Sequence, residues 1–128
     1  MIKAVIFDLL GLFVGVPDGE KDKLITLASQ IKKQRAKVFI LSNLYEDDYA
    51  FLDGITDGRY FAGQTGFVKP DERAYRLILD ENDIKPEECL YFDDSDGNVE
   101  VASGLGIHAF KFEGAEKLKE ILAEQDFG

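Results

Sequence analysis

Three short apolar runs constrain the fold of this chain more than any other feature. They are residues 1–7, which Lys3 alone interrupts, residues 38–41 and residues 89–92. Nearly continuous hydrophobic runs of this length are typical of strands in a parallel sheet that is covered on both faces. Helical patterns lie between them, and such alternation implies right-handed crossover connections. The sequence therefore predicts an α/β fold, a three-layer, doubly wound parallel sheet, in a single domain over residues 1–128.

Apolar periodicity and the positions of glycine and proline predict the individual elements. We expect strands at 2–7, 37–41, 89–93 and 107–112, with a shorter strand near Tyr60 and Phe61. Helices are expected at 19–35, 45–53, 70–81, 97–104 and 114–124, with Pro70 in the first turn of its helix. The acidic stretch 46–48 is interpreted as N-terminal charge of the helix at 45–53. Residues 9–17 contain two glycines and a proline, which predicts a tight loop or small hairpin.

A polar side chain follows each of the three apolar runs. Asp8 ends the first run, Ser42 the second and Asp93-Asp94 the third, and Lys69 lies between the serine and the acid pair. The carboxyl ends of parallel strands form the edge at which open α/β sheets bind ligands. Carboxylates gathered there can hold Mg²⁺, which prefers oxygen ligands and phosphate. Acid, hydroxyl, lysine and acid pair together suit the handling of a phosphoryl group.

Composition excludes several classes of partner. The 25 acidic and 15 basic residues give a net charge of −10, which argues against binding to nucleic acids and to anionic membranes. The single cysteine, Cys89, cannot form an internal disulfide, and no apolar stretch is long enough to span a membrane. We therefore expect a cytoplasmic protein.

Four motifs in this order resemble the haloacid dehalogenase (HAD) superfamily. They are Ile6-Phe7-Asp8-Leu9-Leu10-Gly11, Ile40-Leu41-Ser42-Asn43, Gly66-Phe67-Val68-Lys69-Pro70, and Tyr91-Phe92-Asp93-Asp94-Ser95 with Asn98-Val99-Glu100 after it. The last motif looks most like the branch that contains sugar-phosphate phosphatases and the phosphatase domain of soluble epoxide hydrolases. The resemblance implies a Rossmann-like sheet of strand order 5-4-1-2-3.

The same resemblance implies a Mg²⁺-dependent phosphomonoester phosphatase. Asp8 would attack phosphorus to give an aspartyl-phosphate. Lys69 would neutralise charge on the nucleophile and on the transferring group, and Ser42 and Asn43 would also bind phosphate. The implied ligands of Mg²⁺ are Asp8, the backbone carbonyl of Leu10, Asp94 and, through a water molecule, Asp93.

Leu10 departs from the family pattern, because most HAD phosphatases have a second aspartate two residues after the nucleophile. That aspartate protonates the leaving group and then activates water. General acid–base help contributes roughly 10²–10⁴-fold to the rate, so slow turnover is expected. The alternative is a catalytically impaired binding or regulatory module of the same fold. A phospho-acceptor receiver domain is disfavoured by motif order, because receivers carry the acidic pair on their first strand.

The chain also lacks a cap domain. Neither the interval from Asp8 to Ser42 nor that from Ser42 to Lys69 is long enough to hold one. Three consequences compete: a large substrate closes the site, an oligomer partner covers it, or specificity is poor. The substrate would be a small phosphorylated metabolite or a phosphorylated macromolecule. The apolar loop 9–16 either packs on the helix that follows it or forms a homo-oligomer contact. A shortened form of a longer protein is a further alternative.

Overall fold

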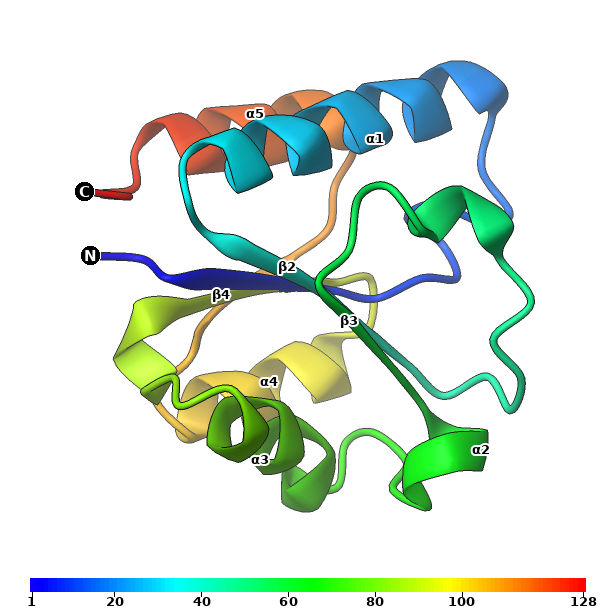
Figure 1. Cartoon of the computed structure of the whole chain (residues 1–128), viewed down its shortest axis with the longest axis vertical. Helices are drawn as coiled ribbons and strands as arrows, with labels where there is room; N and C mark the ends of the chain where they lie inside the picture. Colours follow the sequence, from blue (N-terminus) through cyan, green and yellow to red (C-terminus); the bar gives the residue numbers. More distant parts are fainter.

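A five-stranded parallel sheet forms the centre of the computed structural model, which describes residues 1–128 (Figure 1). The strands are β1 (Ala4–Phe7), β2 (Lys37–Ser42), β3 (Gly58–Phe61), β4 (Cys89–Asp93) and β5 (His108–Lys111). Their spatial order is β3-β2-β1-β4-β5, and every neighbouring pair is parallel. This confirms the predicted doubly wound sheet, whose order 5-4-1-2-3 is the same arrangement read from the opposite edge.

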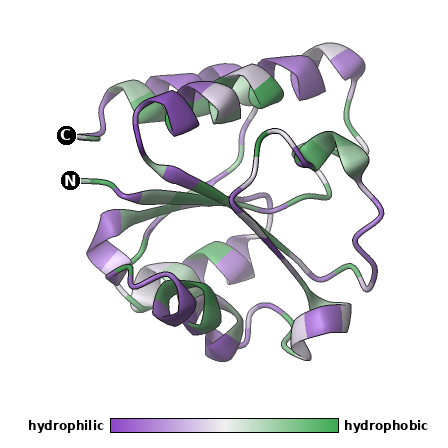
Figure 2. Ribbon diagram, in the orientation of Figure 1, coloured by the Kyte–Doolittle hydropathy of each residue, from purple (hydrophilic) through white to green (hydrophobic).

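Helices cover both faces of the sheet. One layer contains α1 (Asp18–Lys33) and α5 (Ala115–Ala123), and the other contains α3 (Glu72–Glu81) and α4 (Asp96–Gly104) (Figure 1). Alternate residues of β1 enter the two cores: Val5 and Phe7 pack with the first layer, and Ala4 and Ile6 with the second. The strands are therefore apolar throughout, whereas the outer helix surfaces are hydrophilic (Figure 2).

Strand register brings the polar ends of β1 and β4 together. Phe7 pairs with Phe92 across the two strands, and the backbone N–H of Asp8 donates to the carbonyl of Phe92 at 2.9 Å. Asp8 and Asp93 thus follow directly on paired residues. Both chain termini lie at the opposite edge, where the N–H of Ile2 donates to the carbonyl of Asp126 (Figure 1).

The segment 45–53 differs from the prediction. Its only helical turn is a short 3-10 helix, η1 (Ala50–Leu52). The acids on either side of this turn bind one arginine of β3, because Arg59 pairs with Asp47 at 3.1 Å and with Asp53 at 2.7 Å. The predicted helix at 45–53 and its N-terminal charge are therefore wrong: of the stretch 46–48, Asp47 pairs with Arg59 of β3 instead.

Two other details differ from the prediction, one helix boundary and one short helix. Helix α3 begins at Glu72 with Asp71 as its N-cap, so Pro70 precedes the helix and does not lie in its first turn. A four-residue helix, α2 (Ala62–Thr65), follows β3 directly, and the sequence pattern gave no sign of it.

The apolar loop after β1 packs mainly inward. Leu9, Leu12 and Phe13 are buried in the core beneath α1, and Leu10 is exposed. This packing favours the first of the two roles considered for the loop, and a homo-oligomer contact stays a prediction. No cap domain is inserted between β1 and β2 or between β2 and α3. No helix combines the length and hydrophobicity that crossing a bilayer requires.

Candidate active site

A cavity of about 380 Å³ opens at the carboxyl edge of the sheet. It lies at the ends of β1, β2 and β4, where the polar side chains that follow the apolar runs meet. The structure brings together every site residue predicted from the sequence: the cavity is lined by Asp8, Leu10, Ser42, Asn43, Lys69, Asp93 and Asp94, together with Gly11, Val14, Gly15, Leu44, Ser95 and Asn98.

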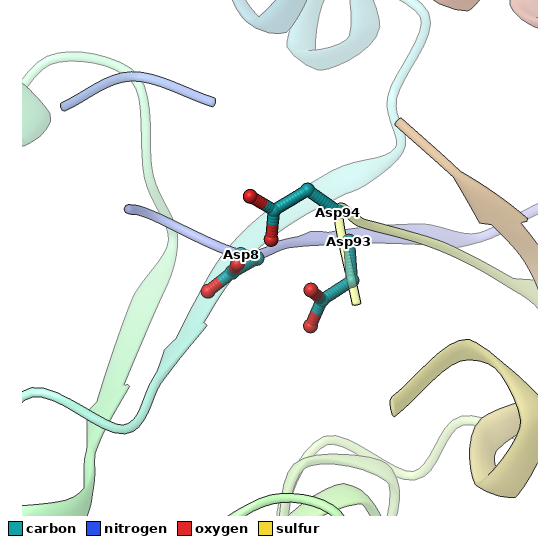
Figure 3. Close-up of side chains that lie close together, drawn as sticks. All are labelled: Asp8, Asp93 and Asp94. Carbon is teal, nitrogen blue, oxygen red and sulfur yellow. The ribbon is translucent and has the colours of Figure 1, made fainter. Parts of the chain in front are cut away.

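Three carboxylates converge in this cavity. One oxygen from each of Asp8, Asp93 and Asp94 lies within 4.8 Å of the other two (Figure 3). Asp94 is exposed, and its carboxylate lies directly against Gly11. A Cβ atom on Gly11 would stand 2.1 Å from Asp94 Oδ2, and Gly11 has a φ of +92°. The backbone conformation therefore favours glycine at this position, and a side chain there would displace the Asp94 carboxylate from its place beside Asp8.

Lys69 lies at the centre of the cluster and is almost fully buried. Its ammonium group donates to Asp8 Oδ1 at 2.8 Å, to Asp93 Oδ2 at 2.9 Å and to the carbonyl of Leu41 at 3.0 Å. A lysine has three N–H donors, so all of them are engaged. In this arrangement Lys69 has no free N–H for a further acceptor.

Asp93 is fully buried and accepts hydrogen bonds from four groups. In addition to Lys69, Tyr91 donates its hydroxyl proton to Oδ2 and Asn98 donates its amide to the same oxygen at 3.0 Å. The backbone N–H of Ser95 donates to Oδ1 at 2.9 Å. Burial raises the pKa of Tyr91, so its hydroxyl stays protonated and remains a donor. Both oxygens of Asp93 are thus held by internal donors.

The two buried acids have pKa values shifted in opposite directions. Burial raises the pKa of Asp8 from its ordinary value of 3.8 to about 7, although the nearby Lys69 lowers it, and the charge of Asp93 adds to the increase. Burial also opposes ionisation of Asp93. There, however, the charge of Lys69 and the hydrogen bonds from Tyr91, Lys69 and Ser95 outweigh burial and hold the pKa below its ordinary value. The two acids thus pair with the same lysine, but only Asp93 is favoured as a carboxylate.

Ser42 and Asn43 end β2 in different ways. The hydroxyl oxygen of Ser42 accepts from the N–H of Leu44 at 3.1 Å, which leaves its own proton free for a ligand. The amide of Asn43 is paired with the backbone of Lys69, accepting from its N–H at 2.7 Å and donating to its carbonyl at 3.1 Å. The Asn43 side chain therefore fixes the lysine loop, that is, the segment 66–71 that contains Lys69. Only the Asn43 backbone remains to contact phosphate.

The donor set fits a hard divalent cation. The carboxylate of Asp94 forms no hydrogen bond within the chain, and the carbonyl oxygen of Leu10 accepts none. Unpartnered carboxylate and carbonyl oxygens beside Asp8 are the ligand types that Mg²⁺ prefers. Asp93, in contrast, already has its oxygens occupied. This contrast suits direct coordination of a cation by Asp94 and an indirect contact, through a water molecule, by Asp93.

Sequence reasoning missed four residues that support the site. Gly11 makes room for Asp94, and Tyr91 and Asn98 fix Asp93. Tyr75 adds a further layer, because its hydroxyl donates to the carbonyl of Asn98 at 3.0 Å and its ring packs edge-on against Tyr91. The positive φ of Gly11 could have been suspected from its place in the first motif. Nothing in the sequence distinguishes the two tyrosines from ordinary core residues.

Comparisons with known proteins agree with this fold. An uncharacterized protein from Corynebacterium glutamicum is 25% identical, with a TM-score of 0.84, over 96% of this chain and 94% of that one. A HAD family enzyme from Bacteroides thetaiotaomicron, solved in complex with magnesium and inorganic phosphate, has a TM-score of 0.72 over 94% and 99% of the two chains. At 15% identity, the second likeness shows the fold alone.

The sequence relationships are of two kinds. A 59-residue segment is 39% identical to acyl-CoA dehydrogenase family member 10 from Mus musculus; it covers 45% of this chain but only 6% of that much longer protein. The family profile of haloacid dehalogenase-like hydrolases, in contrast, matches residues 2–106. Because that match includes β1, β2 and β4 and every residue around the cavity, the chain belongs to the haloacid dehalogenase-like hydrolases.

Proposed function

We propose that this protein is a Mg²⁺-dependent phosphomonoester hydrolase with Asp8 as its nucleophile. The observation that carries the proposal is the convergence of Asp8, Lys69, Asp93 and Asp94 in one cavity. Lys69 forms ion pairs with Asp8 and Asp93, whereas the Asp94 carboxylate has no partner within the chain. The magnesium and inorganic phosphate in the related Bacteroides enzyme support the same chemistry.

Asp8, Asp94 and the carbonyl of Leu10 would hold the cation, and Asp93 would act through a water molecule. When bound, Mg²⁺ offsets the repulsion between a carboxylate and a phosphate, which otherwise opposes attack. It would also favour the ionised form of Asp8, whose pKa burial raises to about 7.

The residues of the chain would then act on the phosphoryl group directly. An oxygen of Asp8 attacks phosphorus, and the bond from phosphorus to the ester oxygen breaks. The charge of Lys69, 2.8 Å from Asp8, aligns the nucleophile and stabilises the negative charge that collects around phosphorus. The free proton of Ser42 and the backbone at Asn43 bind phosphate oxygens at the end of β2.

Leu10 limits the rate of this reaction. Its side chain is 53% exposed and lines the cavity, at the position where an acid would supply and remove protons. Leucine can do neither, so we expect turnover roughly 10²–10⁴-fold below that of an enzyme with aspartate there. The same observation favours the second candidate function, a binding module that keeps the fold and the metal site without efficient catalysis.

Release of inorganic phosphate from a panel of phosphomonoesters, with and without Mg²⁺, separates the two candidates. The Asp8→Asn variant is the blank, because it keeps the shape of the side chain and removes the nucleophile. Mg²⁺-dependent release above this blank establishes a phosphatase, and Leu10→Asp should then increase the rate. Equal release by wild-type protein and Asp8→Asn would refute the assigned nucleophile. No release by folded protein would favour the binding module.

A further inference from the structure

We infer that the preferred substrates of this site are aryl phosphates, that is, monoesters whose leaving group is a phenol. This inference rests on the proposed phosphatase function and specifies its substrate class. A small phenolic phosphate and a phosphotyrosyl side chain present the same chemistry to the site.

The first argument concerns the proton that a leaving group needs. The titratable side chains around the cavity are Asp8, Lys69, Asp93 and Asp94. Asp8 is the nucleophile, and Lys69 and Asp93 are held by internal hydrogen bonds. Asp94 lies against Gly11 among the metal ligands. Leu10 lines the cavity at the position where the family resemblance implies an acid, and the lining has no further titratable side chain that could deliver a proton.

A leaving group that is not protonated must be a weak base. As Asp8 forms its bond to phosphorus, the P–O bond of the ester breaks and its electron pair leaves on the oxygen, which takes a proton from solvent. Water then attacks the phosphoryl group on Asp8 and releases phosphate and the carboxylate. A phenol has a pKa of about 10, whereas that of an alkyl alcohol lies near the value for water, about 15.7. A phenolate can therefore leave without the missing acid, and an alkoxide cannot.

The second argument concerns the surface that the leaving group meets. Leu10, Val14 and Leu44 line the cavity, and the Cδ1 atom of Leu10 lies over Gly15. Of the two amides in the lining, Asn43 is paired with the Lys69 backbone and Asn98 donates one N–H to Asp93. A flat apolar ring can pack on the three aliphatic side chains, whereas sugar hydroxyls placed against them would lose hydrogen bonds to water.

The charge of the cavity argues against a second anionic group on the substrate. Lys69 is the only cationic side chain in the lining, and it is already paired with two carboxylates. A carboxylate or second phosphate on the leaving group would meet three acids and no free cation. This disfavours phosphorylated hydroxyacids and bisphosphates.

The dependence of the rate on leaving-group acidity tests the inference. We would measure kcat/KM with Mg²⁺ for substituted phenyl phosphates, propyl phosphate and ribose 5-phosphate. The wild-type protein should prefer phenyl over propyl phosphate by at least about 100-fold and respond steeply to the phenol pKa. Leu10→Asp should flatten this response by accelerating the alkyl esters. Leu10→Asn is the matched control, because asparagine has the shape of aspartate without its ionisable group. This variant should keep the steep response.

Two further measurements complete the test. A phosphotyrosyl peptide compared with phenyl phosphate decides which source of aryl phosphate is preferred. Calorimetry with Mg²⁺ should show benzylphosphonate binding several-fold more tightly than 3-hydroxypropylphosphonate or phosphonoacetate. This tests the apolar wall, that is, Leu10, Val14 and Leu44, without turnover. Equal kcat/KM for phenyl and propyl phosphate in an active enzyme would overturn the inference alone. No hydrolysis of any ester would overturn the proposed function and the leaving-group argument, and the phosphonates would still test the wall.

Discussion

At the scale of single residues, the site depends on two aspartates that share one lysine. Asp8 and Asp93 each lie within 2.9 Å of the Lys69 ammonium, but only Asp93 has three further donors. A buried cluster of two carboxylates and one ammonium carries an unbalanced negative charge. The unfavourable electrostatic energy shows in the raised pKa of Asp8, whose negative charge a bound cation would offset.

This imbalance predicts opposite effects of two similar substitutions on metal-free protein. Asp8→Asn should raise the free energy of unfolding by about 2 kcal/mol at pH 8, because it removes the less favourable charge. Asp93→Asn should lower it by about 3 kcal/mol or more, since it removes a charge paired with Lys69 and replaces one of two acceptor oxygens by an NH2 group that faces donors. Urea denaturation in EDTA measures both, with the exposed Asp94→Asn as control.

The pH dependence of the same experiment follows from the pKa of Asp8. Between 3.8 and about 7 the folded protein binds more protons at Asp8 than the unfolded chain, so its contribution to stability falls as pH rises through this window. The advantage of Asp8→Asn over wild type should therefore be small near pH 4 and grow toward pH 8. A constant difference, or a loss of stability at pH 8, would contradict this assignment.

Sequence reasoning identified which residues meet in the cavity, and it could not show how they are bonded there. The order of strand-end residues is enough to place Asp8, Ser42 and Asp93 at one edge, because parallel strands end together. The saturation of Lys69, the use of the Asn43 side chain to hold the Lys69 backbone and the donors to Asp93 depend on distances between segments far apart in the chain. The catalytic and ligand roles of these residues stay predictions.

At the scale of elements, strands were predicted best and short helical turns worst. A run buried on both faces leaves a continuous apolar pattern that few other structures produce. The segment 45–53 has the composition of a helix, but Arg59 binds its acids and Tyr49 stacks on Phe61. These contacts join the segment to residues of β3, and no pattern within 45–53 reveals them.

The connection between β2 and the lysine loop provides a test at this scale. Asn43→Ala removes two hydrogen bonds to the Lys69 backbone and should cost about 1–2 kcal/mol of stability. Because Lys69 would lose its alignment, kcat/KM for phenyl phosphate should also fall at least about 10-fold. Asp71→Ala is the matched control: it removes the N-cap of α3, costs about 1 kcal/mol, and should leave kcat/KM unchanged. Equal losses of activity in both variants would show that general destabilisation, not alignment, is responsible.

At the scale of the whole molecule, the cavity that is lined by the three acids lies at the carboxyl edge of the sheet. Both chain termini lie at the opposite edge (Figure 1). The net charge of −10 attracts cations generally, so metal binding at the cavity must be distinguished from screening of the surface. Both core layers meet at the sheet, and a ligand that fastens β1 to β4 should stabilise the whole fold.

Mg²⁺ at 100 times its Kd should therefore raise Tm by roughly 5–10 °C in the wild-type protein. The Asp94→Asn variant should lose most of this increase, because it removes a carboxylate that has no internal partner. Thermal scans with KCl at matched ionic strength provide the control for screening. A Tm increase that KCl reproduces, or that Asp94→Asn retains in full, would show that Mg²⁺ does not bind at this cavity.

The central claim is that Asp8 receives the phosphoryl group, and trapping that group tests it most directly. Wild-type protein would be mixed with phenyl phosphate and Mg²⁺, quenched in acid within milliseconds to seconds, digested and analysed by mass spectrometry. Because Leu10 cannot activate water, the aspartyl-phosphate should accumulate. The account predicts one added phosphoryl group on the peptide that contains Asp8, dependent on Mg²⁺ and absent from Asp8→Asn. Phosphate release without that modification, or with a phosphoryl group on another residue, would contradict it.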